Sequence, residues 1–302
     1  MPRADPTLRS RARGALLAHA AGNALGVPTE FLGSAEAIAR RFPGGVREVI
    51  RHDTADSPYD DDVAMALRLA EELLEPEPDL EHLGRRWIEW ARTDGRGIGN
   101  WTRTALDYLA RNGRAITNSL GQAGNGAVMR CLPVALASFT DPEVVVRRAW
   151  DTAVLTHPDP RAAWPAVAVS VAAAGYLRGD RDVIPEVLGV LGAGGARDEV
   201  LGAVRRVPAE RRKDLPITGA AAGYAVHCME IALWAAHHEP SLEQALIWLV
   251  NAGGDTDTNA AVAGGLLGAR DGEEAVPERW IGALPGPDYL RMLADRLIGR
   301  RR

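Results

Sequence analysis

The sequence of 302 residues predicts an all-α fold, and three observations support this prediction. Apolar residues recur three and four positions apart along most of the chain, which is the period of helices with one buried face. No segment shows the strict alternation of apolar and polar residues that marks a half-buried strand. Glycine- and proline-rich stretches separate the periodic segments, as turns between helices would. We expect one domain over residues 1–302, a compact bundle of crossing helices.

Composition excludes several classes of protein. The net charge of −5 argues against a nucleic-acid binder that works by bulk electrostatics. No apolar run reaches the roughly 20 residues that span a bilayer, and the first residues lack the apolar core of a secretory signal. The two cysteines, Cys131 and Cys228, lie in apolar helical patterns, so we expect buried thiols and not a disulfide. We therefore expect a cytoplasmic protein without membrane contact, and a monomer.

The first predicted helix covers residues 9–25 and carries a stripe of small residues. Gly14, Ala18 and Gly22 are spaced four apart, so they lie on one face and let another helix approach closely. Proline and glycine end this region, and Glu30 falls in the loop that follows. Its side chain is either an exposed loop acid or a functional group.

A second helix is predicted to begin at three consecutive aspartates, after a loop over residues 43–58. Acidic residues in a first helical turn are favoured by the free N–H groups and the helix dipole. That preference explains one or two of Asp60, Asp61 and Asp62. Three in a row repel each other by on the order of 1 kcal/mol even when exposed. A bound cation would relieve this repulsion.

Further helices follow in order, and the tail from Arg291 is basic and expected to fray. The pattern predicts helices over 80–93, from 102, 127–138, 142–155, 160–178, two short ones within 180–216, 218–236, 241–250 and 258–270.

A glycine-rich segment precedes the helix predicted at 127–138. Gly121, Gln122, Gly124, Asn125 and Gly126 lie here, and backbone amides at such a junction make an anion site. A glycine turn that merely caps the helix explains the pattern equally well.

The loop between the helices at 142–155 and 160–178 holds His157, which is a capping group, a core histidine or a ligand contact.

The segment 251–261 places strongly polar residues between two apolar helices. Asp255, Asp257 and Thr258 offer three oxygen donors within four residues, more than a helix cap needs. Hard cations such as Mg²⁺ and Mn²⁺ prefer carboxylate, hydroxyl and carbonyl oxygens. One short segment rarely completes such a shell, so we expect the three aspartates at 60–62 to share the cation. The two ends of the chain must then fold together.

The order of these motifs resembles the ADP-ribosylglycohydrolase family, which includes the dinitrogenase reductase-activating glycohydrolases. The resemblance covers about residues 11–270 and rests on the segments 14–30, 61–67, 124–130, 156–157, 223–234 and 253–258. It implies the family's all-helical fold with two divalent cations, Mg²⁺ or Mn²⁺, in a cleft. The implied metal ligands are Asp60, Asp61, Asp62, Asp255, Asp257 and Thr258.

The resemblance also implies a ligand site and a reaction. An ADP-ribose-like diphosphate would face Gly124 and Gly126, within the segment that also holds Gly121, Gln122 and Asn125, and His157 would contact the ligand. The cations would bind ribose hydroxyls and lower the pKa of a water molecule. Glu30 is the expected general acid or base; if it is out of reach, one of the aspartates at 60–62 takes this role, and we take Asp61.

Four positions depart from the family pattern and keep the substrate open. Asn23 replaces a common aspartate, Asp60 stands where threonine is usual, Val63 where a hydroxyl residue is common, and Gly97 where an acid is often found. The principal expectation is hydrolysis of a ribosyl C1″–N or C1″–O bond in an ADP-ribosylated protein or small molecule. The alternatives are an N-glycosidase that acts on a small nucleoside or nucleotide, and a pseudoenzyme that binds ADP-ribose without turnover.

Overall fold

A computed structural model describes residues 7–50, 59–118, 121–219 and 221–299. Every regular element in these ranges is helical, which confirms the all-α prediction, and one isolated antiparallel bridge joins Gly124 to Tyr224. The elements are α1 (Leu8–Gly26), η1 (Val27–Thr29), α2 (Ala35–Arg41), α3 (Asp61–Leu73), α4 (Leu80–Thr93), α5 (Asn100–Asn112), η2 (Asn125–Ala127), α6 (Leu132–Ser138), α7 (Pro142–Val154), α8 (Pro160–Arg178), α9 (Ile184–Ala193), α10 (Asp198–Arg206), η3 (Arg212–Asp214), α11 (Ala225–His238), α12 (Leu242–Val250), α13 (Thr256–Asp271), η4 (Glu273–Ala275), α14 (Glu278–Ile281) and α15 (Pro287–Ile298).

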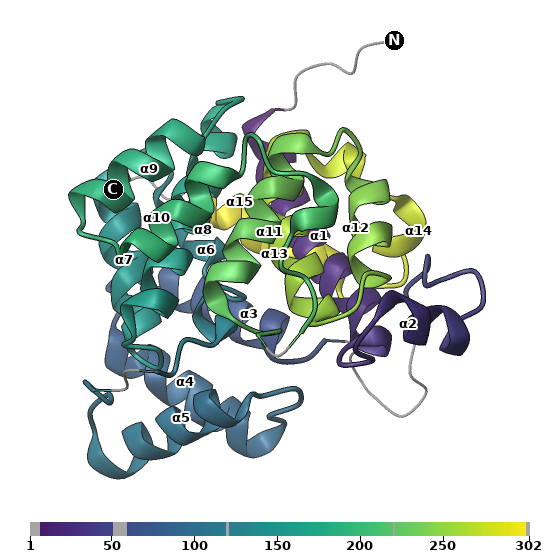
Figure 1. The fold of residues 1–302 in the computed structure, drawn as a ribbon. Helices are drawn as coiled ribbons and strands as arrows, with labels where there is room; N and C mark the ends of the chain where they lie inside the picture. Colours follow the sequence, from purple (N-terminus) through teal and green to yellow (C-terminus); the bar gives the residue numbers. More distant parts are fainter. Residues whose placement is uncertain (1–6, 51–58, 119–120, 220, 300–302) are drawn as a thin grey trace.

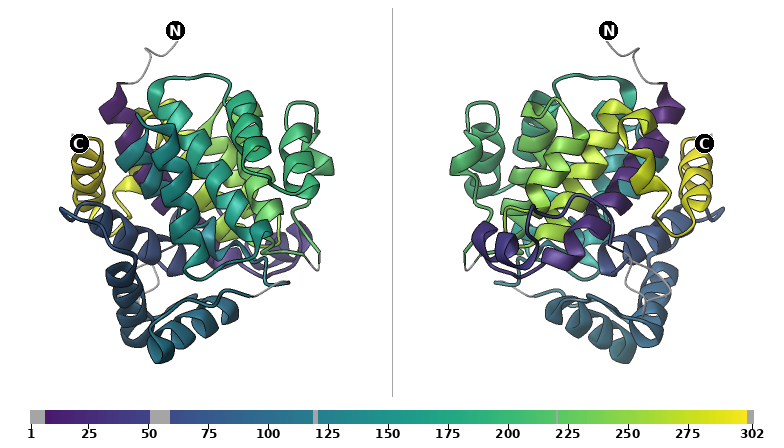
Figure 2. Two further views of the ribbon diagram at one scale, coloured as in Figure 1. Left: turned by 90° about the vertical axis from the view of Figure 1, so that its left-hand side faces the viewer. Right: turned by 90° about the vertical axis from the view of Figure 1, so that its right-hand side faces the viewer.

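The centre of the molecule is the pair formed by α1 and α13, which lie side by side although they come from opposite ends of the chain (Figures 1 and 2). Both helices are almost wholly buried. A Cβ added at Gly22 would lie 2.1 Å from the carbonyl oxygen of Ala260, and one at Gly264 would lie 2.3 Å from that of Ala18. The small-residue stripe predicted on the first helix is therefore confirmed as a close helix contact.

The other helices surround this pair. α8, α11 and α12 pack on α13, and α15 packs on α1. α4 and α5 form a hairpin that projects below the rest of the molecule in Figure 1 and again in both views of Figure 2. Trp87 and Trp90 of α4 are buried, as are Cys131 and Cys228, which are free thiols. Among the described helices, none combines the length and hydropathy that crossing a bilayer requires.

The C-terminal segment corrects one expectation, because the residues from Arg291 to Ile298 are helical and not frayed. Leu293 and Leu297 of α15 are buried, and Asp295 hydrogen-bonds to two arginines of α1. These partners lie about 280 positions away in sequence, so local periodicity gave no sign of them. Residues 300–302 lie outside the described ranges.

Two helices begin later than predicted, and one helix was not predicted at all. The helix expected over 127–138 begins only at Leu132, after the short η2, and the helix expected from 218 begins at Ala225. The bridge between Gly124 and Tyr224 holds the segments that precede these two helices in an extended conformation, since Asn125 N–H donates to the Gly223 carbonyl. α2 was not predicted. Residues 43–50 are a loop as expected, and 51–58 lie outside the described ranges.

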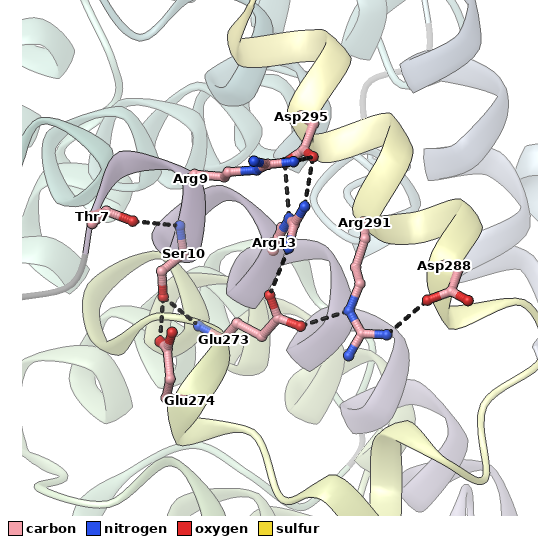
Figure 3. A network of polar contacts seen from close by, with 9 residues as sticks. All are labelled: Thr7, Arg9, Ser10, Arg13, Glu273, Glu274, Asp288, Arg291 and Asp295. Carbon is pink, nitrogen blue, oxygen red and sulfur yellow. Dashed lines mark hydrogen bonds and ion pairs between the residues drawn. The ribbon is translucent and has the colours of Figure 1, made fainter.

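A network of ion pairs fastens the start of α1 to α15 and η4 (Figure 3). Arg13 Nη2 lies 2.7 Å from Asp295 Oδ2, and Arg9 Nη2 lies 2.5 Å from the same oxygen. Glu273 receives Arg291 at 2.6 Å and lies 3.6 Å from Arg13. Every charge in this network therefore faces at least one charge of opposite sign.

Candidate functional site

The two acidic clusters predicted from the sequence meet at the opposite end of the α1–α13 pair. Carboxylate oxygens of Asp60, Asp62 and Asp257 all lie within 4.8 Å of one another, which is close enough to share a cation. A second group with the same spacing consists of Glu30, Asp255 and Asp257. Asp257 belongs to both groups and therefore links the start of α3 to the loop after α1.

Helix capping does not explain these aspartates. Asp60 and Asp255 stand at the N-cap positions of α3 and α13, yet neither side chain makes a capping hydrogen bond. By contrast, Asp79, Asp141 and Asp159 cap their helices through the side chain. The carboxylates at the starts of α3 and α13 are thus left available for another partner.

Neutral groups alone support the acidic cluster. The Asn23 amide of α1 donates to Asp60 Oδ1 at 2.6 Å and to Asp62 Oδ2 at 3.2 Å. The Thr258 hydroxyl lies 3.5 Å from the same oxygen of Asp62. Across the described part of the chain, no arginine, lysine or histidine forms an ion pair with any of these aspartates. The described residues therefore leave the negative charge at the site unbalanced.

The electrostatic consequence appears in the carboxyl groups themselves. Burial, followed by repulsion from Asp60 and Asp255, raises the pKa of Asp61 to about 8. Burial and neighbouring carboxylates also raise the pKa values of Asp62 and Asp257 well above the usual range. Oδ1 of Asp62 and Oδ1 of Asp257 are buried without a hydrogen-bond partner. Such groups are costly to bury alone, and a divalent cation would offset that cost.

Glu30 lies beside this cluster because the loop after α1 is tied down from both sides. The Thr29 hydroxyl donates to the carbonyl of Val250 at 2.7 Å, which fixes the loop to the end of α12. A Cβ at Gly26 would lie 2.3 Å from Asp257 Cα, so the end of α1 touches the start of α13 directly. Burial, then repulsion from Asp255 and Asp60, raises the pKa of Glu30 to about 8.

The segment around Gly97 closes another side of the cluster. Gly97 has a φ of +75°, and a Cβ there would lie 2.7 Å from both Asp60 Cβ and Asp61 Oδ1. The position therefore has no room for a side chain unless Asp60 moves. Asp61 lies outside both three-carboxylate groups. Like its neighbours it is buried, with an exposed fraction of 7%.

The glycine-rich loop lies next to the cluster but differs from the expected helix junction. Because α6 begins only at Leu132, the loop leads into a single 3₁₀ turn and not into an α-helix dipole. The Asn125 amide donates to Asp255 Oδ2 at 2.8 Å, which connects the loop to the acidic cluster. Gly121 donates its N–H to Asp159 Oδ2 at 2.8 Å, whereas Gln122 is exposed.

His157 lies against the same loop. Its side chain is 1% exposed, and a Cβ added at Gly126 would lie 2.7 Å from its Cε1 atom. Thr156 Oγ1 lies 2.8 Å from its Nδ1 atom. The structure thus brings together the residues that the sequence singled out, while their roles in binding and catalysis stay predictions.

Three residues with contacts at the site were not assigned a role from the sequence. Asn23 was noted only as a departure, although it holds two aspartates. Asp159 was given no role either; it caps α8 through its side chain and also accepts a hydrogen bond from Gly121 N–H. Arg130 follows an apolar run and is 1% exposed. A single arginine in such a run is the one sequence signal that could have indicated a buried cation.

Comparisons with known proteins identify the family of this chain. A sequence model of the family described as ADP-ribosylglycohydrolase matches residues 4–302. The ADP-ribosyl-[dinitrogen reductase] glycohydrolase of Rhodospirillum rubrum is 30% identical, with 92% of each chain covered. The ADP-ribosylarginine hydrolase Tri1 of Serratia proteamaculans is 25% identical over 95% of this chain and 79% of its own.

A solved structure is similar as well. It is described as an ADP-ribosylglycohydrolase-related protein complex and matches with a TM-score of 0.80 and 29% identity, over 97% of this chain and 98% of the other. The resemblance predicted from the motifs is thereby confirmed. The chain belongs to the ADP-ribosylglycohydrolase family, a family of glycoside-cleaving hydrolases.

Proposed function

We propose that this protein is a metal-dependent hydrolase that cleaves the bond between ribosyl C1″ and a nitrogen or oxygen atom of an ADP-ribosylated protein or small molecule. The observation that carries the proposal is the buried carboxylate set in which Asp257 belongs to two groups of ligand spacing. Family membership supports the reaction class, and the relatives named above support ADP-ribosylated substrates.

Two divalent cations, Mg²⁺ or Mn²⁺, fit the chemistry of the donor set. Asp60, Asp62 and Thr258 would hold one, Glu30 and Asp255 would border the other, and Asp257 would lie between them. The two buried oxygens without partners, on Asp62 and Asp257, are free to become ligands. When bound, the cations supply positive charge that offsets the carboxylates and polarises oxygen atoms of the sugar.

The chain's own residues would bind the substrate and move a proton. During hydrolysis the C1″ bond to the leaving nitrogen or oxygen breaks, a water oxygen bonds to C1″ and loses a proton, and the leaving group takes up a proton. We assign this proton exchange to Glu30, because it borders the cluster and its side chain is partly exposed. Asp61 is the alternative, because it lies outside both ligand groups. The loop at 121–126 and His157 would hold the rest of the ligand.

A substrate panel tests the proposal. The purified protein with Mg²⁺ or Mn²⁺ is incubated with ADP-ribosyl-arginine, ADP-ribosyl-serine and free nucleosides, and released ADP-ribose or base is quantified. We expect ADP-ribose release that requires the metal and is lost on chelation. Release of base from nucleosides alone would favour the N-glycosidase reading. Tight ADP-ribose binding with no turnover of any substrate would identify a binding protein and contradict the proposal.

A further inference from the structure

Arg130 is a buried cation, and no carboxylate of the described residues contacts it directly. It lies between η2 and α6, is 1% exposed, and its guanidinium stacks 4.1 Å from the ring centroid of Trp87. Its Nη1 donates to the carbonyl oxygen of Gly126 at 2.7 Å, and its Nη2 donates to Thr156 Oγ1 at 2.6 Å. One side chain therefore fastens both the glycine-rich loop and the residue that precedes His157.

The direction of this hydrogen-bond chain follows from what each group can do. A guanidinium only donates, so Thr156 Oγ1 accepts from Arg130. The hydroxyl hydrogen then points to His157 Nδ1, 2.8 Å away, the one acceptor that the described residues place within its reach. If Nδ1 carried the proton instead, the hydroxyl hydrogen would be buried without an acceptor, which native interiors avoid. Donation from the cation also polarises the hydroxyl and makes it a better donor.

The surroundings of the His157 ring disfavour a second proton. Burial, and then the nearby charge of Arg130, hold the pKa of His157 well below its usual value. Because Nδ1 accepts, the single ring proton must lie on Nε2. A Cβ at Gly126 would lie 3.0 Å from Nε2, and one at Gly124 would lie 4.0 Å away, so this nitrogen faces the glycine-rich loop.

We propose that Arg130 and Thr156 are positioning residues that hold His157 as the neutral tautomer protonated on Nε2, so that its ring donates one hydrogen bond to an acceptor oxygen of the ligand in the loop. The ligand part of this inference rests on the proposed function. His157 then acts as a fixed donor and not as an acid or base. Among the described residues none takes a hydrogen bond from Nε2, so the donor is not committed to the protein itself.

Ring-nitrogen NMR of the protein labelled with ¹⁵N-histidine tests the tautomer without metal or ligand. The signals of His157 are identified by their loss in His157→Gln. We expect Nε2 to show the shift of a protonated nitrogen and Nδ1 that of an unprotonated one, unchanged from mildly acidic to mildly alkaline pH. A protonated Nδ1 in the wild-type protein overturns the proposal by itself, whatever the variants do.

Two variants of one residue separate the hydroxyl from the shape of its side chain. Thr156→Val keeps the branched shape and removes the donor, whereas Thr156→Ser keeps the donor. We expect the valine variant to lose the single tautomer and to bind ADP-ribose about tenfold more weakly. The serine variant should keep the tautomer and bind within about twofold of wild type. Unchanged tautomer and affinity in the valine variant would also overturn the proposal.

The two proposals fail in different ways. If ADP-ribose binds to no form of the protein, the proposed function is contradicted while the tautomer measurement stands. If ADP-ribose binds and is released from substrates, yet the ring is protonated on Nδ1, only the positioning role of Arg130 and Thr156 is lost.

Discussion

The carboxylates at the two ends of the α1–α13 pair have different partners. Where α1 begins, carboxylates meet guanidinium groups, and hydrogen bonds from Arg13 and Arg9 lower the pKa of Asp295 below its ordinary value. Where α1 ends, carboxylates meet only each other and neutral amides, and burial raises the pKa of Asp257. The first arrangement is balanced within the protein, whereas the described residues supply no positive partner to the second.

The ion-pair network contributes to the stability of the fold, whereas the acidic cluster is the candidate functional site. The ion-pair network is partly exposed, with 24% of the Asp295 side chain accessible, so it stabilises modestly. The acidic site is buried, with Asp257 only 2% exposed, so its repulsion is screened little and acts against the folded chain. A cluster that destabilises its own fold is a sign of a ligand, and the ligand that we propose is a cation.

The largest effect is expected from a substitution in the acidic cluster. Asp257→Asn should remove metal-dependent stabilisation and lower hydrolysis by on the order of 10³-fold, because this carboxylate belongs to both groups. Without metal, the same variant should melt at a higher temperature than wild type, since it removes a buried charge that lacks a counter-ion.

Calorimetry with and without Mg²⁺ or Mn²⁺ measures this effect. Wild type should gain about 2.7 kcal/mol of stability at a metal concentration one hundred times the dissociation constant. Asp288→Asn, on the exposed surface of α15, is the matched control and should behave as wild type. A metal response that survives in Asp257→Asn would remove this site from consideration.

A smaller effect is expected from a substitution in the contact between α1 and α13. Gly22→Ala places a methyl group 2.1 Å from the carbonyl oxygen of Ala260, so α1 and α13 must separate. We expect a loss of about 3 kcal/mol in the free energy of unfolding, read from denaturant titration. Gly189→Ala in α9 is the control, because nothing lies within 4 Å of the added methyl. It should stabilise by about 0.5 kcal/mol; equal effects of the two variants would contradict the close packing.

The smallest effect is expected from a substitution in the ion-pair network at the start of α1. Asp295→Asn removes the partner of Arg9 and Arg13 and should cost about 1 kcal/mol at neutral pH and low salt, less at high salt. Since the pKa of Asp295 is lower in the folded state than its usual 3.8, the unfolded chain binds the proton more readily. The contribution is therefore present above about pH 4 and disappears as pH falls below it.

Denaturant titrations of wild type and Asp295→Asn over this pH range check the sign. The two stabilities should converge in acid. The exposed pair of Arg85 and Glu81 provides the comparison, and Glu81→Gln should cost no more than about 0.5 kcal/mol. A difference between wild type and Asp295→Asn that grows in acid would contradict the assigned pairing.

Much of the fold follows from local sequence. The predicted ranges of α4 and α8 agree with the structure at both ends, because Asp79 and Asp159 cap the helices through their side chains and Gly179 ends the second. α6 and α11 begin later than predicted, since a bridge between Gly124 and Tyr224 competes with helix at both places. α15 was missed because its stabilising partners lie on α1.

The candidate site could also be predicted only in part from the sequence. The carboxylates were recognisable because consecutive or alternate aspartates at a helix start are electrostatically unfavourable without a partner. Their meeting is visible only in three dimensions, as are the amide of Asn23 between Asp60 and Asp62 and the contact of Gly97 with Asp60. Arg130 could not be placed from sequence because its acceptors, a carbonyl and a hydroxyl, carry no charge.

The pairing of α1 with α13 also sets the order in which the molecule is completed during synthesis. The Thr256 hydroxyl donates to the Gly26 carbonyl across 230 positions of sequence. At ribosomal rates of about 5–20 residues per second, α1 waits on the order of 10 s or more for its partner. Until then, the face of α1 that α13 covers in the finished fold lacks its partner.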